Sequence, residues 1–95
     1  MYTIYVVFKC FPEKRERFVE RVKEEGILEA ILAEDGCRKY EYYFSESDPN
    51  ELLLIEAWDS REHQRVHIGQ PHMEKLRSLK DDYIISTELG EFEIK

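Results

Sequence analysis

The chain has 95 residues and a formal net charge of −7, with 42% hydrophobic and 37% charged residues. This length predicts a single domain, residues 1–95, and this balance is typical of a globular protein. The acidity argues against nucleic acid and anionic membranes as partners, because both bind Lys- and Arg-rich surfaces. No apolar run is long enough to span a bilayer, and the first residues lack a signal-peptide pattern, so we expect a cytoplasmic protein.

The first third of the chain predicts a strand followed by helical segments. Residues 1–8 are dense in β-branched and aromatic side chains, which is typical of a buried strand. We expect Pro12 in the first turn of a helix, and apolar residues then recur at helical spacing from residue 13 to residue 32. Gly26 interrupts this pattern, which therefore fits either one long helix with a weak point or two short consecutive helices.

The rest of the chain predicts a hairpin, a helical region and a last strand. Residues 37–58 indicate a long hairpin, with Arg38, Tyr40, Tyr42 and Phe44 on one face of its first strand. Asp59 or Ser60 is expected to cap the next helix, and residues 72–80 to continue as a helix after Pro71. Residues 83–94 predict the final strand, with a bend at Gly90.

This order, β-α-β-β-α-β, predicts an α+β, ferredoxin-like fold in which helices cover one face of an antiparallel sheet. The third strand is apolar on both faces, since Leu52 and Leu54 alternate with Leu53 and Ile55. We therefore expect a homodimer in which a second copy covers the sheet face that the helices leave bare. The alternative is a monomer with scattered exposed apolar side chains.

Several short motifs follow one another in the second half of the chain: DGCRKY at 35–40, DPN at 48–50, EAW at 56–58, residues 60–62 and HIGQPH at 67–72. Together they resemble the antibiotic biosynthesis monooxygenase (ABM) family over about residues 2–92. The resemblance implies a dimeric α/β barrel in which two ferredoxin-like sheets pack face to face. It also implies oxidative chemistry, although this superfamily includes isomerases and haem-degrading enzymes. The haem-degrading relatives carry an asparagine where this chain has Val6 or Val7, so we do not expect haem.

The expected function is a cofactor-independent monooxygenase that uses O₂ to oxidise a small aromatic quinol, phenol or polyketide-like molecule. Such an enzyme needs an aromatic-lined cavity, a base that works near neutral pH and donors that steady the developing anion. Two alternatives remain open: a non-catalytic ligand-binding or regulatory homodimer, and an isomerase of a small oxygenated metabolite.

The candidate catalytic residues are His67, Glu56 and Trp58. We expect His67 to be the base, because an imidazole changes charge near neutral pH. Glu56 and Trp58 share a strand face, and Glu56 either faces a polar cavity or pairs with a cation such as Arg38. Trp58 either lines the pocket or packs in the core, and His72 either faces the same cavity or caps its helix.

The candidate substrate-binding residues are the aromatic stripe Tyr40, Tyr42 and Phe44, together with His72. The stripe lines a cavity if it faces the helices, and an interface if it faces away. His63 and His67 have a spacing that can hold a metal ion, with His72 nearby, but no glutamate directly follows His63 as in catalytic zinc helices, and no cysteine lies close in the sequence. We therefore expect no metal, and the expected cofactor-independent chemistry implies no organic cofactor.

Overall fold

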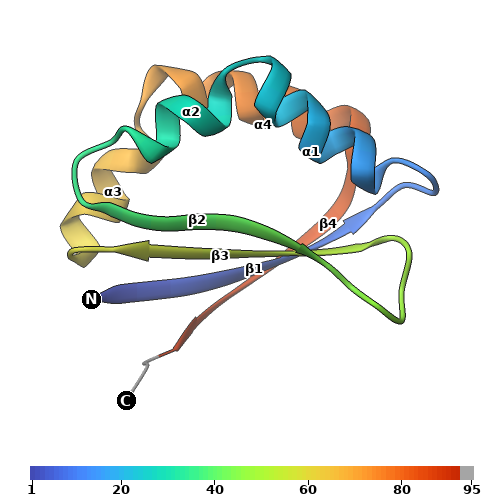
Figure 1. The fold of residues 1–95 in the computed structure, drawn as a ribbon, viewed down its shortest axis with the longest axis horizontal. Helices are drawn as coiled ribbons and strands as arrows, with labels where there is room; N and C mark the ends of the chain where they lie inside the picture. The colour runs from blue at the N-terminus through green and yellow to red at the C-terminus, as the bar shows by residue number, and fades with distance from the viewer. Residues whose placement is uncertain (93–95) are drawn as a thin grey trace.

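The computed structural model describes residues 1–92, in which a four-stranded antiparallel sheet lies beneath four helices (Figure 1). In chain order the elements are β1 (Tyr2–Cys10), α1 (Arg15–Glu24), α2 (Ile27–Leu32), β2 (Cys37–Phe44), β3 (Glu51–Trp58), α3 (Arg61–Ile68), α4 (Pro71–Tyr83) and β4 (Ile84–Phe92). The strand order is β2-β3-β1-β4. The predicted ferredoxin-like α+β fold is confirmed, with each predicted helical region divided into two helices.

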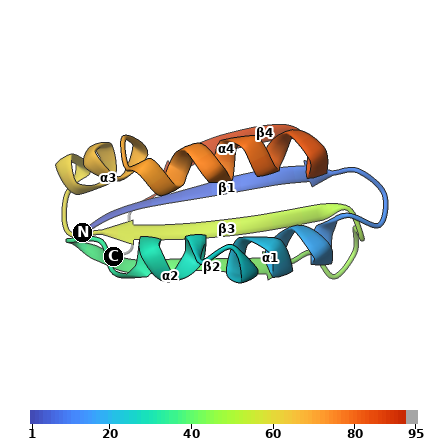
Figure 2. The same cartoon turned by 90° about the horizontal axis from the view of Figure 1, so that it is seen from above.

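The helices form one layer over the sheet. Seen from above, α1 and α2 lie along β2, whereas α4 lies along β1 and β4 (Figure 2). Alternate strand residues point into the space between the two layers, and helix residues at spacings of three and four meet them there. The fully buried side chains of this core include Phe8, Leu52, Leu54 and Trp58 from the sheet and Phe18, Val22, Ile27, Ile31 and Leu76 from the helices.

Two predicted helix boundaries need correction, and one open alternative is decided. The first helical region is two helices, because Gly26 adopts a left-handed conformation (φ +74°) that breaks the helix and precedes α2. Pro12 does not lie in the first turn, since α1 begins only at Arg15. Tyr83 ends α4 rather than beginning the last strand. The predicted strand residues 93 and 94 lie outside the described residues.

The first hairpin strand does not alternate as predicted at its beginning. The register between β2 and β3 shifts between Cys37 and Lys39, which is the signature of a β-bulge. Arg38 is exposed as a result, while Cys37 and Tyr40 both pack against the core. The prediction that Arg38 shares the face of Tyr40 is therefore wrong, whereas Tyr40 and Tyr42 do face the helices.

No element among residues 1–92 covers the opposite face of the sheet. Tyr5 and Tyr43 are each 37% exposed there, and Val7, Leu53 and Ile55 are only partly buried. The homodimer predicted to cover this face stays a prediction. Among residues 1–92, no helix is long and apolar enough to cross a membrane.

Candidate functional site

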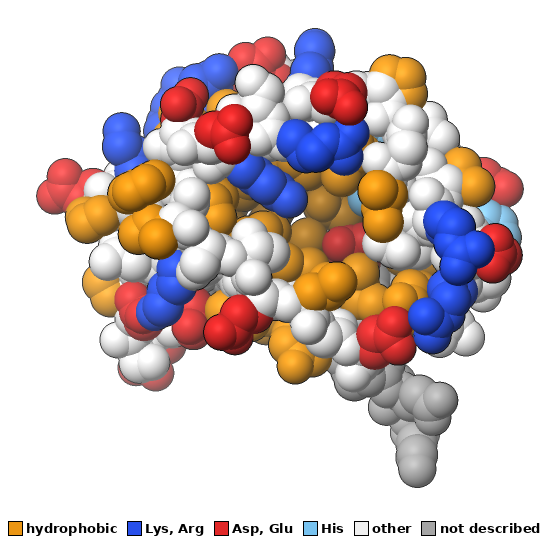
Figure 3. Space-filling view, turned by 180° about the vertical axis from the view of Figure 1, so that it is seen from behind, with side chains coloured by type: hydrophobic (Ala, Val, Ile, Leu, Met, Phe, Trp, Pro, Cys, Tyr) orange, Lys and Arg blue, Asp and Glu red, His pale blue; other side chains and the backbone are white. Residues whose placement is uncertain are grey.

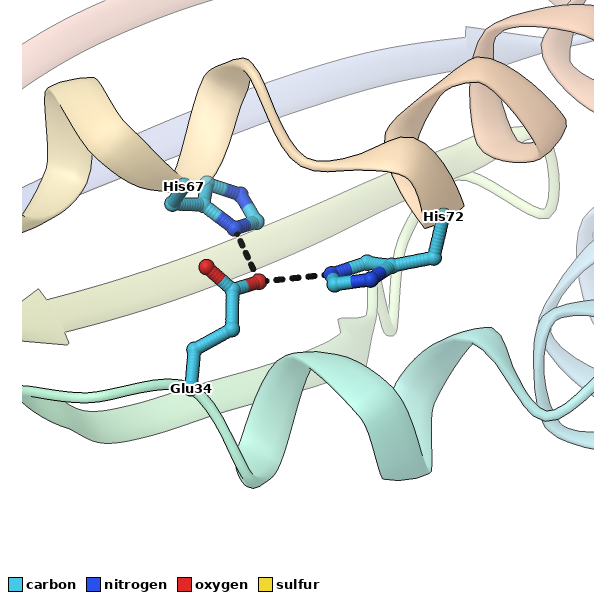
Figure 4. Close-up of side chains that lie close together, drawn as sticks. All are labelled: Glu34, His67 and His72. Atoms are coloured by element: carbon cyan, nitrogen blue, oxygen red, sulfur yellow. Dashed lines mark hydrogen bonds and ion pairs between the residues drawn. The ribbon is translucent and has the colours of Figure 1, made fainter.

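Three side chains from separate parts of the chain converge at one end of the helical layer (Figure 4). His67 lies near the end of α3, His72 is the second residue of α4, and Glu34 lies in the turn between α2 and β2. His67 Nδ1 and His72 Nε2 each lie 2.7 Å from the same carboxylate oxygen, Oε2 of Glu34. An ionised carboxylate can only accept hydrogen bonds, so each imidazole donates through the nitrogen that faces it. In the neutral tautomer that donates through Nδ1, the lone pair of His67 is on Nε2.

Local sequence signals place the two imidazoles. The Ser60 side chain accepts a hydrogen bond from the backbone N–H of His63 and so caps α3, which selects Ser60 from the two predicted capping residues. Pro71 occupies the first turn of α4, where its missing N–H costs nothing. The short connection between the two helices therefore brings His67 and His72 to the same carboxylate.

The other side of the His67 ring faces the sheet. The ring stacks on Trp58 with 4.6 Å between centroids and meets the edge of Tyr40 at 5.7 Å. Its Nε2 lies 3.9 Å from Oε1 of Glu56, which is too far for a hydrogen bond. His67 is only 1% exposed, so its ring is enclosed by these neighbours.

Glu56 is a buried carboxyl group at the base of this arrangement. Trp58 Nε1 donates a hydrogen bond of 3.1 Å to its Oε1. Burial raises the pKa of Glu56, and the Trp58 hydrogen bond opposes that rise. The prediction that Arg38 pairs with Glu56 is wrong, because the Arg38 guanidinium binds Asp59 at 2.5 Å instead. The other predicted possibility, that Glu56 faces a polar cavity, stays a prediction, and the structure shows the carboxyl group 5% exposed and bound to the Trp58 indole.

Lys80 approaches Glu56 from α4 and was not predicted. Burial lowers the pKa of Lys80, and the negative charge of Glu56 opposes that effect. The Lys80 ammonium lies 5.1 Å from the centre of the Phe8 ring on β1, so it reaches across the space between α4 and the sheet. Seen from behind the view of Figure 1, the surface is hollowed, with hydrophobic side chains around the hollow and an acidic group inside it (Figure 3).

The aromatic stripe on β2 is divided between two environments. Tyr40 belongs to the His67 cluster, and Tyr42 packs its ring edge against Tyr40 at 6.0 Å. Phe44 lies at the far end of β2, is 48% exposed and carries the Arg15 guanidinium at 4.6 Å from its ring. All three line an open groove of about 510 Å³ between β2 and the helices α1 and α2. The structure therefore does not bring Phe44 to the cluster.

Five predicted site residues thus lie around one point: His67, Glu56, Trp58, Tyr40 and His72. Sequence reasoning missed Glu34 and Lys80. Glu34 directly precedes the DGCRKY motif, but it lies in a turn where no periodicity indicates its direction. Lys80 did carry a signal, because it is four residues after Leu76 and therefore lies on the buried face of α4.

Comparisons with known proteins agree with this fold. The family model described as "Antibiotic biosynthesis monooxygenase" matches residues 1–78. The chain is 33% identical over 75 residues to "Putative monooxygenase Rv0793" of Mycobacterium tuberculosis, with 79% of this chain and 73% of that protein covered. It is 26% identical over 81 residues to "Probable quinol monooxygenase YgiN" of Escherichia coli K12, with 77% of this chain and 78% of that protein covered.

A solved structure extends the likeness to the whole chain. The crystal structure of a conserved protein from Methanosarcina mazei Go1 superposes with a TM-score of 0.82 at 28% identity, covering 100% of this chain and 95% of that one. The family model alone spans well over half of the sequence, and the structural likeness includes the remaining elements. This chain belongs to the antibiotic biosynthesis monooxygenase family.

Proposed function

We propose that the protein is a cofactor-independent monooxygenase that oxidises a small aromatic quinol or phenol with O₂, and that His67 is its base. The observation that carries the proposal is the Glu34–His67 pair, which leaves the Nε2 lone pair of His67 directed toward the interior. A carboxylate that fixes the tautomer of a histidine and stabilises its protonated form is a recurrent way to make a general base. The name of the Escherichia coli relative, a quinol monooxygenase, supports the choice of substrate class.

The reaction needs only a base and an enclosed site. His67 Nε2 takes a hydroxyl proton, and the quinolate formed passes one electron to O₂. Semiquinone and superoxide then combine to form a C–O bond at a ring carbon that carries hydrogen, and the peroxide takes the proton back from His67. Loss of water breaks the O–O and C–H bonds and leaves a carbonyl group. The sum is quinol plus O₂ giving hydroxyquinone plus water.

The surroundings of His67 fit these requirements. Trp58 and Tyr40 flank the imidazole with flat apolar surfaces, against which an aromatic ring can stack. The Lys80 ammonium is the nearby cation that can stabilise a phenolate or superoxide, because charges interact strongly where water is excluded. Burial lowers the pKa of Lys80, but the negative charge of Glu56 opposes this effect and so favours the charged form of the ammonium there.

The same proposal includes a homodimer, in which the sheets of two copies pack face to face as an α/β barrel. It also places the protein in the cytoplasm. The partly exposed Tyr5, Tyr43, Val7, Leu53 and Ile55 give the outer sheet face an apolar character that a second copy can bury. A second sheet there would also stiffen the floor of the site, since His67 and Glu56 lie just on the other side of the sheet.

The test is oxygen uptake by the purified protein with a quinol such as menadiol, above the autoxidation rate of the quinol alone. We expect one atom of ¹⁸O₂ in the product and the other in water. Release of the label as hydrogen peroxide would show simple quinol oxidation instead of oxygen insertion. Tight binding of aromatic compounds, seen as quenching of the single tryptophan, Trp58, without oxygen uptake would overturn the proposal in favour of a ligand-binding homodimer.

A further inference from the structure

We infer that Glu34, His67 and His72 form a binding site for a divalent transition-metal ion such as Zn²⁺, and that the bound ion removes the base function of His67. The second part rests on the proposed function, whereas the first part stands on the geometry alone. The sequence-based expectation of no metal started from the spacing of His63 and His67, with His72 nearby. The structure instead combines His67 with His72 and with a carboxylate that is 33 residues earlier in the chain.

The donor atoms converge on one point. The carboxylate of Glu34 has two oxygens, yet both imidazoles aim at Oε2 (Figure 4). The three donor atoms all lie within 4.8 Å of one another. Around a tetrahedral zinc ion, ligand atoms lie about 3.3 Å apart. Opening the two nitrogen–oxygen distances from 2.7 Å to that value needs shifts of less than an ångström.

The chemistry of the donor set selects the kind of ion. Two imidazole nitrogens and one carboxylate oxygen suit borderline ions such as Zn²⁺, Fe²⁺ or Co²⁺, whereas Ca²⁺ and Mg²⁺ prefer oxygen ligands alone. Three protein ligands leave a coordination position for water. The cluster is therefore suited to reversible binding rather than to a closed structural zinc site.

A carboxylate lies on the far side of the His67 ring from the cluster. Metal-ligating histidines usually direct their second ring nitrogen to a carboxylate or carbonyl oxygen. The second nitrogen of His67 faces Glu56 Oε1 at 3.9 Å, and Trp58 fixes that oxygen through its indole N–H. Glu56 thus lies on the side where such an outer carboxylate belongs, although beyond hydrogen-bond distance, so it would have to move closer to accept the Nε2 proton.

A cation can also reach the cluster. Glu34 and Val66 line an open groove of about 360 Å³ whose other lining residues include Asp35 and Glu62 but no lysine or arginine among the described residues. The His72 side chain is 20% exposed and faces a neighbouring groove. The groove beside Glu34 is therefore acidic, whereas the groove at His72 also has Lys75 in its lining, and the net charge of −7 favours the approach of a cation.

Metal binding would change the state of His67. With the ion on Nδ1, the neutral imidazole carries its proton on Nε2, so the lone pair that accepts the substrate proton is gone. The ion also takes the carboxylate of Glu34, which otherwise stabilises the protonated imidazole. Metal occupancy and proton transfer by His67 therefore exclude each other.

The experiment is a titration of tag-free, metal-free protein with Co²⁺, followed by competition with Zn²⁺. We expect one Co²⁺ per chain with the visible absorption of a four- or five-coordinate ion, displaced by Zn²⁺. The variants Glu34→Gln and His72→Gln should each weaken binding at least tenfold. The matched control is His63→Gln on α3, whose side chain is bound to Ser60 and lies outside the cluster, and its affinity should stay within twofold.

Several outcomes would overturn the inference: no saturable Co²⁺ binding to the parent protein, equal loss in His63→Gln, or unchanged affinity in His72→Gln. Because the parent titration decides the first point, a variant that fails to fold does not block the test.

Oxygen uptake gives the second readout. Zn²⁺ should lower the rate of the parent in proportion to occupancy, while the ratio of rates with and without Zn²⁺ in His72→Gln should approach one. If no quinol is oxidised at all, the proposed function fails while the Co²⁺ result still decides the metal site.

Discussion

Replacing Glu34 by glutamine keeps the shape of the side chain and removes its charge. The carboxylate accepts two hydrogen bonds of 2.7 Å, and it is only 9% exposed, so solvent screens these bonds little. A hydrogen bond to a charged group contributes about 1.5–3 kcal/mol, against about 0.5–1.5 kcal/mol for a neutral one. The substitution should therefore cost about 1 kcal/mol per bond, or about 2 kcal/mol of unfolding free energy.

The same loss should act on catalysis, because the imidazole is protonated during the reaction. Only the bond to His67 acts on the base, and at about 1.4 kcal/mol per factor of ten its share of about 1 kcal/mol corresponds to roughly a fivefold fall in kcat/KM. Urea unfolding followed by Trp58 fluorescence, at fixed protein concentration, measures the first quantity, and oxygen uptake measures the second. The matched control is Glu62→Gln, an acid 74% exposed on α3, which should change unfolding free energy by less than about 0.5 kcal/mol. A Glu34→Gln variant as stable and as active as the parent would refute the role of this carboxylate.

The other structural predictions concern separate parts of the molecule. Burial raises the pKa of Cys10 to about 11. Its thiol should therefore resist Ellman's reagent at pH 8 in the native protein and react faster as the pH rises toward 11. A native protein that reacts at the rate seen in urea would contradict this prediction. Gly36→Ala should lower the free energy of unfolding in urea by about 1–3 kcal/mol more than Gly26→Ala does. Both glycines have positive φ, but only a Cβ at Gly36 meets the His63 ring, at 2.4 Å. Equal losses of unfolding free energy in the two variants would count against this contact. Ile55→Lys on the bare sheet face should convert the proposed dimer to a monomer in light scattering, and a parent that is already monomeric at micromolar concentration would rule out the dimer.

Much of the fold could be predicted because the strand pattern is regular. Ile4, Val6 and Phe8 alternate with less buried neighbours, as the period of a strand requires, and they are all at most 6% exposed. The hairpin was also predictable, since residues 37–44 and 51–58 flank a clear turn signal. What the pattern could not reveal was the bulge at Arg38, because one extra residue in a strand leaves no mark on composition.

The site was predictable in its residue types more than in its connections. Trp58 and His67 were both candidate site residues, and the structure brings their rings to 4.6 Å between centroids, while their roles in a pocket stay predictions. The partner of His67 was missed, because the contact with Glu34 joins a turn to a helix end and depends on how α2 and α3 pack. The partner of Glu56 was misjudged for a similar reason: the bulge turns Arg38 outward to Asp59.

The most direct test of the account compares initial rates of oxygen uptake with menadiol for the parent and for His67→Ala, at equal concentrations of folded protein. Because removal of the buried ring leaves a cavity, circular dichroism and a second variant, His67→Gln, check that any loss is not one of folding. We predict a fall of at least tenfold in both variants. A folded variant that keeps a rate within twofold of the parent would contradict the claim that His67 accepts the substrate proton.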